Sequence, residues 1–137
     1  MRIFFGIFLA STANFFGGIL GFYIAKNSFI NSQAPTEFQS NLTFLSYFYS
    51  FFFKFLVIMI LAWIMHRAIA MLDTPKKRIL FIFLLGSTFS MYSHIDIFWA
   101  DHSLVWSFIK VVGESLNWLM TGYILSKFFK PKHLGAL

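Results

Sequence analysis

Three ionisable residues, Lys54, Lys110 and Glu114, interrupt otherwise apolar stretches of this sequence. Lys110 and Glu114 lie four residues apart, so a helix would place them on one face, where they can form an ion pair. Polar residues continue this face at intervals of three or four: Ser103, Ser107, Lys110, Glu114, Asn117 and Thr121. An ion pair that only cancels its own charge does not need such polar neighbours in register. The stripe therefore predicts a polar surface that faces the interior of a helical bundle.

A second group of chemically capable residues lies near position 100 and consists of His94, Asp96, Asp101 and His102. Imidazole and carboxylate groups bind zinc, copper, iron or manganese, which makes these four residues candidate metal ligands. Their spacing matches no named metal motif, and the ends of membrane spans are commonly polar, so anchoring at the membrane surface is the preferred interpretation. Glu114 with His94 and Asp96 can also perform acid–base chemistry in a dry site, which leaves a lipid-modifying enzyme as an alternative. The sequence assigns no cofactor.

The composition indicates which elements must hold these residues. Of the 137 residues, 58% are hydrophobic and 12% are charged, whereas soluble domains average roughly 45–50% and 25%. A soluble domain of this size leaves too much of its surface exposed to hide so many apolar side chains. We therefore predict an integral membrane protein and exclude a soluble enzyme. The chain contains no cysteine, so disulfides and thiol chemistry are excluded as well.

Four apolar stretches are long enough to cross the ~30 Å hydrocarbon core of a bilayer as helices. They predict an all-α, four-transmembrane-helix antiparallel bundle, a single domain over residues 1–137, with helices at about 3–25, 43–65, 79–99 and 104–128. The predicted external loop covers residues 26–42, and the predicted cytoplasmic loop covers residues 66–78. The first stretch is expected to remain as a helix, because it is longer than the apolar part of a signal peptide.

The basic residues predict the orientation of these helices. Eight of them lie before the first stretch, between the second and third, or at the end of the fourth: Arg2, Arg67, Lys76, Lys77, Arg78, Lys127, Lys130 and Lys132. The connections on the other side contain only Lys26. Because Lys and Arg are retained in the cytoplasm, both termini are expected there. The membrane is expected to be a bacterial inner (plasma) membrane. The net charge of +6 then reports topology, and no nucleic-acid partner is expected.

Small residues on the first predicted helix recur at a spacing of four: Ala13, Gly17, Gly21 and Ala25. Small side chains let two helix backbones approach closely in a membrane, where no hydrophobic force drives helices together. These four residues therefore predict a packing face. Its partner is either another helix of the same bundle or a second copy of the chain.

Lys54 and Glu114 lie at nearly the same predicted depth, about 15 Å from the external surface at ~1.5 Å per residue. A charge at this depth needs an interior partner, so we predict that these two residues pair across helices. Lys110 is then left for Asp96 or for a ligand. The predicted pocket opens to the outside and contains Asn14, Lys54, His94, Asp96, Lys110, Glu114 and Asn117.

These features favour a small transporter or channel component that handles a polar or charged solute or protons. The main alternative is a non-catalytic accessory subunit or assembly factor of a larger membrane complex. That role also explains a short chain with a large lipid-facing aromatic surface. The expected partners are the lipid bilayer and either further copies of the chain or such a complex.

Overall fold

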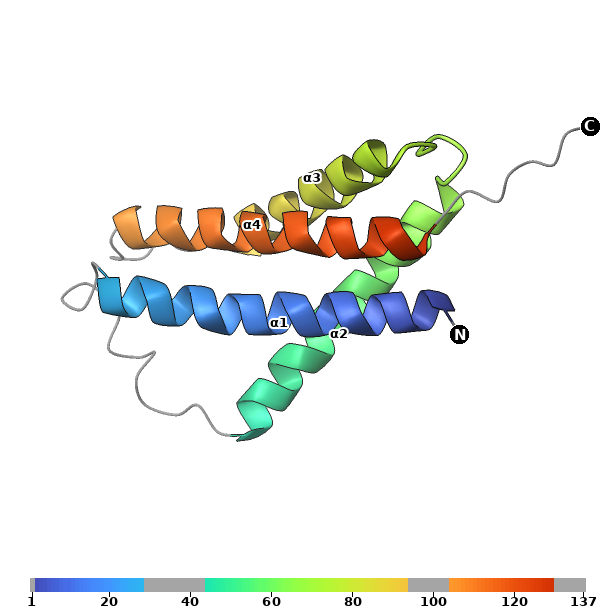
Figure 1. Ribbon diagram of the computed structural model, residues 1–137. Helices are drawn as coiled ribbons and strands as arrows, with labels where there is room; N and C mark the ends of the chain where they lie inside the picture. The colour runs from blue at the N-terminus through green and yellow to red at the C-terminus, as the bar shows by residue number, and fades with distance from the viewer. Residues whose placement is uncertain (1, 29–43, 94–103, 130–137) are drawn as a thin grey trace, which may run out of the picture.

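The chain is described by a computed structural model over residues 2–28, 44–93 and 104–129. The regular elements of this part of the chain are all helices, as predicted, with α1 at Arg2–Ser28, α2 at Phe44–Arg67, α3 at Pro75–Ser93 and α4 at Leu104–Phe128. Figure 1 shows α1 and α4 side by side, running in opposite directions, with α2 crossing them at a steep angle. The most extensive contacts join α3 to α4 and α1 to α4, and α2 contacts α1 more than it contacts α3. α4 is therefore the central helix.

Two helical segments are long and apolar enough to cross a membrane, Arg2–Gly21 within α1 and Phe44–Arg67, which is the whole of α2. The described part of α3 and the whole of α4 are less apolar. α3 begins with Lys76, Lys77 and Arg78 in its first turn, and α4 carries Lys110 and Glu114. The structure thus supports four helices of which two have the composition of membrane spans.

The turn between α2 and α3 differs from the expected loop at 66–78, because α3 begins at Pro75, four residues before the expected start at 79. Thr74 caps the helix: its Oγ1 accepts a hydrogen bond from the Lys77 amide at 3.3 Å. Proline also suits the first helical position, where no amide hydrogen is needed. Capping rather than hydropathy therefore decides where α3 begins.

Arg78 was expected in that loop but is only 3% exposed within α3. Its Nη1 donates hydrogen bonds to the carbonyl oxygens of Leu72 and Asp73 at 2.8 and 3.0 Å. Its Nε is buried without a hydrogen-bond partner among the residues that the structure describes. The arginine closes the α2–α3 turn by satisfying carbonyl groups that no helix pairs.

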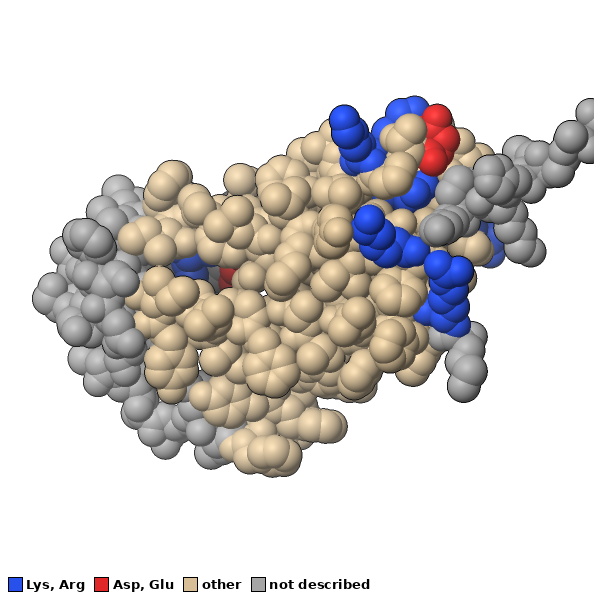
Figure 2. Space-filling view, viewed as in Figure 1, with Lys and Arg blue, Asp and Glu red and all other residues tan. Residues whose placement is uncertain are grey.

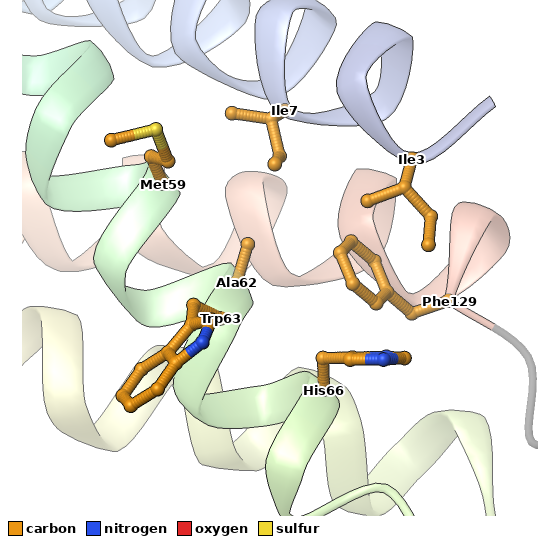
Figure 3. A pocket seen from close by; sticks show the side chains of 7 residues that line it. All are labelled: Ile3, Ile7, Met59, Ala62, Trp63, His66 and Phe129. Atoms are coloured by element: carbon orange, nitrogen blue, oxygen red, sulfur yellow. The ribbon is translucent and has the colours of Figure 1, made fainter. Parts of the chain in front are cut away.

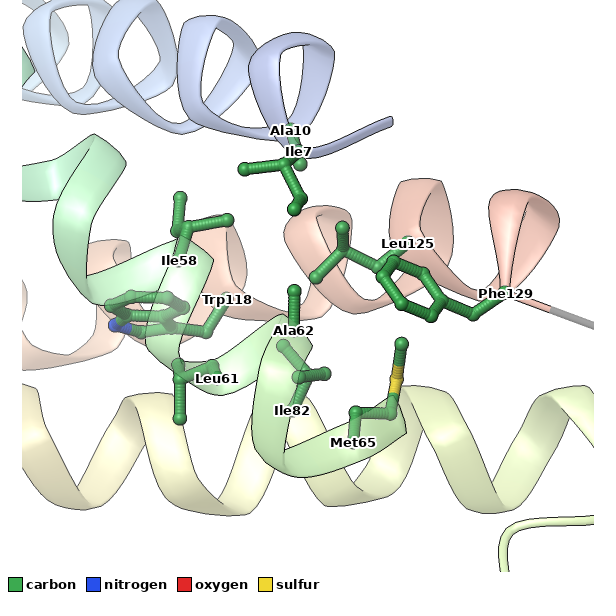
Figure 4. Close-up of a cluster of buried hydrophobic side chains, with 10 residues drawn as sticks. All are labelled: Ile7, Ala10, Ile58, Leu61, Ala62, Met65, Ile82, Trp118, Leu125 and Phe129. Atoms are coloured by element: carbon green, nitrogen blue, oxygen red, sulfur yellow. The ribbon is translucent and has the colours of Figure 1, made fainter. Parts of the chain in front are cut away.

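A core of ten apolar side chains from all four helices, and from the residue that follows α4, lies toward the end that holds this turn (Figure 4). Its members are Ile7, Ala10, Ile58, Leu61, Ala62, Met65, Ile82, Trp118, Leu125 and Phe129. Gly86 of α3 makes room for Trp118, since the indole ring occupies the position of a Cβ at that glycine. The Trp118 Nε1 donates a hydrogen bond to Ser90 Oγ at 2.8 Å, which fixes α4 on α3.

Large apolar side chains cover the outside of the bundle on every helix. Phe16, Leu20, Phe53, Leu84 and Leu116 are each more than half exposed. Figure 2 shows that the middle of this face is almost free of charged side chains, with blue basic side chains gathered at the end that holds the N-terminus and the α2–α3 turn. Soluble monomers rarely expose apolar patches of more than a few hundred Å², so this surface fits a lipid environment.

Candidate functional site

Lys54 of α2 and Lys110 and Glu114 of α4 form a charged cluster inside the bundle. All three side chains are partly buried. Glu114 interacts electrostatically with both lysines. Lys54 and Glu114 each lie ten residues beyond the first residue of their helix, Phe44 and Leu104, which is about 15 Å along each axis. Lys54, Lys110 and Glu114 are thus near enough to interact electrostatically, and the direct pairing of Lys54 with Glu114 across helices stays a prediction.

α1 approaches this charged cluster through two glycines. A Cβ at Gly18 would lie 2.9 Å from Lys54 Nζ and 3.9 Å from Asn117 Nδ2, so both nitrogens lie beside the α1 backbone. At Gly17, the Asn117 Oδ1 atom fills the space that a Cβ would need. Lys54 therefore extends between α1 and α4, and the Asn117 amide lies next to it.

Space remains beside the helices near the charged cluster. A Cβ at Gly21 of α1 or at Gly113 of α4 would meet no atom within 4 Å. Figure 2 shows an opening between α1 and α4 with basic and acidic atoms at its bottom, the one place along the bundle's middle where charge is visible in this view.

Asn14 is also buried between α1 and α4, but it belongs to a separate contact. Its Nδ2 donates a hydrogen bond to Thr121 Oγ1 at 2.9 Å, and Thr121 Oγ1 donates to the Asn117 carbonyl oxygen at 2.8 Å. Both side chains are at most 3% exposed. The polar stripe of α4 therefore has two parts. Lys110 and Glu114 belong to the charged cluster and Asn117 lies next to it, whereas Thr121 joins α4 to α1.

The packing face of α1 differs in detail from the expected series. Gly17 packs against Asn117, but Gly21 has open space beside it, Ala13 is only partly buried, and the side chain of Ala25 lies outside the described part. The deepest positions of α1 are Gly6, Ile7, Ala10, Ser11 and Asn14. The observed packing face is therefore displaced by about one residue from the predicted series. α4 runs along this face, while α2 crosses α1 obliquely (Figure 1).

Several predicted site residues fall outside the part of the chain that the structure describes: His94, Asp96, Asp101, His102 and Ser103. The side chain of Ser107 lies outside it as well. Among the described residues, no group of three or more metal-binding side chains occurs. The contact of Gly18 with Lys54 was not anticipated, although the adjacent Gly17–Gly18 pair at the depth of Lys54 was the available signal.

Two amines and one carboxylate in an apolar bundle can hold a small anion or pass a proton between an amine and the carboxylate. The charged cluster contains two basic groups and one acidic group. Comparison of this chain with protein-family models, with curated proteins and with solved structures finds no match. Function must therefore be inferred from the charged cluster and from the surface around it.

Proposed function

We propose that this chain is a four-span membrane protein in which the charged cluster forms part of a pathway for protons or for a small polar or charged solute. Both termini lie in the cytoplasm, and the opening between α1 and α4 faces the outside. The observation that carries the proposal is that one carboxylate, Glu114, interacts electrostatically with lysines from two helices inside a bundle whose outer surface is apolar.

Membrane insertion of all four helices is supported by where their polar side chains lie. α1 and α2 contain segments with the length and hydropathy of membrane spans. The charges of α4 lie at partly buried positions beside α1 and α2, while Leu116 of the same helix is 61% exposed. α4 can thus enter the bilayer with its apolar residues toward lipid. The basic side chains at one end of the bundle then remain in the cytoplasm (Figure 2).

The energy of buried charges favours a functional role for the charged cluster. One Lys or Asp at the centre of a membrane helix costs about 2.5–3.5 kcal/mol on insertion scales. Replacing a buried ion pair by well-packed apolar residues often leaves the stability of a protein unchanged or raises it. The stability of the fold therefore does not require charged residues at these positions. Binding of a solute or transfer of protons gives a reason for their presence.

Reconstitution of the purified chain in proteoliposomes tests this proposal. We expect the chain alone to dissipate an imposed proton, chloride or potassium gradient. Glu114→Gln should abolish that flux, whereas Asp73→Asn, a change at an exposed carboxylate outside the bundle, should leave it intact. The proposal is wrong if the chain dissipates none of these gradients and instead purifies in mild detergent with a stoichiometric larger partner. That result would identify an accessory subunit. Counting copies in lipid nanodiscs tests the expected self-association.

A further inference from the structure

An apolar groove opens at the end of the bundle where α2 finishes, between α1, α2 and the residue that follows α4. Seven side chains line its volume of about 210 Å³ (Figure 3). Ile3 and Ile7 point into it from α1, and His66 and Phe129 face each other across its other side, with ring centroids 6.0 Å apart. Pockets for drug-sized ligands span ~300–1,000 Å³, so this smaller groove suits one narrow apolar chain.

Two basic residues are next to residues that line this groove, one by contact and one in the sequence. The guanidinium carbon of Arg67 lies over the ring of Trp63, a lining residue, at 5.6 Å from the ring centroid. Arg2 directly precedes Ile3 in the sequence. Of the acidic side chains that the structure describes, only Asp73 lies at this end, and it pairs with Lys77 at 2.8 Å. Basic side chains therefore predominate at the end of the bundle where the groove opens (Figure 2).

We propose that the groove binds one acyl chain of an anionic phospholipid of the cytoplasmic leaflet, with the lipid phosphate against Arg67 and Arg2. This inference rests on the membrane insertion proposed above but not on transport. An apolar groove in a bilayer meets acyl chains first, and basic residues at the cytoplasmic surface attract anionic headgroups. Trp63 beside Arg67 fits the boundary between acyl chains and headgroups, where tryptophan is enriched.

Lipid retention measures this binding directly. The chain is purified in detergent from an equimolar mixture of phosphatidylglycerol and phosphatidylcholine, and the bound lipids are identified by native mass spectrometry. We expect phosphatidylglycerol to be enriched and Arg67→Gln to lower the enrichment by about fivefold, the effect of roughly one basic contact. Met59→Trp, a change at a partly exposed lining residue, should reduce retention of both lipids by filling the groove.

Lys76→Gln is the matched control, because Lys76 is a basic residue exposed at the same end of the bundle, whereas Arg67 lies over Trp63, which lines the groove. Equal retention of the two lipids, or an equal loss for Lys76→Gln and Arg67→Gln, would overturn the proposal. A dimer mass in place of bound lipid would show that a second copy occupies the groove and would overturn it too. Sedimentation with membranes after an alkaline wash tests insertion separately. A negative lipid result with insertion intact therefore counts against the groove alone.

Discussion

Gly122 and Gly113 lie on the same helix, α4, and an alanine at each should change stability in opposite directions. A Cβ at Gly122 would lie 2.9 Å from the Ile79 carbonyl oxygen and 3.2 Å from Ile79 Cα. These are backbone atoms that cannot rotate away, so α3 must shift, and such overpacking costs about 1–3 kcal/mol. A Cβ at Gly113 would meet nothing within 4 Å.

Alanine gains about 1 kcal/mol of helix propensity over glycine at either position. Because this gain is common to both variants, the difference between them isolates the clash with α3. Gly113→Ala should therefore be more stable than Gly122→Ala by about 1–3 kcal/mol. The assay is reversible unfolding in mixed micelles with increasing dodecyl sulfate, followed by far-ultraviolet circular dichroism. If the two variants have equal free energies of unfolding, the close approach of α3 to α4 is wrong.

Three further predictions concern stability and pH. Ser90→Ala leaves the buried Trp118 indole N–H without its acceptor and should lower the free energy of unfolding by about 1–3 kcal/mol in the same assay; Thr88→Ala, on the exposed side of α3, should change it by less than about 0.5 kcal/mol. Thr121→Val removes the acceptor of the Asn14 amide at nearly constant volume and should cost about 0.6–1.7 kcal/mol; no loss would show that the two helices are joined by packing alone. The hydrogen bond from Lys77 lowers the pKa of the exposed Asp73 carboxyl below its ordinary 3.8, so the stabilisation by this pair is complete above that pH and is lost as the pH falls through the lower folded-state pKa. Acid unfolding should therefore depend less on pH in Asp73→Asn than in the parent, and identical pH profiles would contradict this.

The sequence was sufficient to predict the four helices. Apolar stretches of about 20 residues predict four helices. The four-residue spacing of Lys110 and Glu114 predicts a shared face, and helical rise predicts that Lys54 lies at the depth of Glu114. These inferences need only the geometry of one helix at a time.

The relation between helices could not be derived in this way. Whether α1 presents Gly21 or Gly18 to its neighbours depends on the rotation of α1 about its axis and on the oblique crossing of α2. The hydropathy pattern predicts neither of these. For the same reason Asn14 was assigned to the pocket, whereas its amide bonds to Thr121. The assignment of Lys110 to Asp96 or a ligand stays a prediction, because Asp96 lies outside the described part of the chain; a list of depths did not indicate that Glu114 interacts electrostatically with both lysines.

The central claim is that the charged cluster carries solute or protons instead of only joining helices. The most direct measurement is the flux per folded chain in proteoliposomes for Lys54→Met. This variant keeps Lys110 and Glu114 as a neutral pair, so it should insert and unfold like the parent. We expect its flux nevertheless to fall by about tenfold or more, the equivalent of roughly 1.4 kcal/mol. A folded Lys54→Met variant that transports at the parent's rate would contradict a role of the charged cluster in transport.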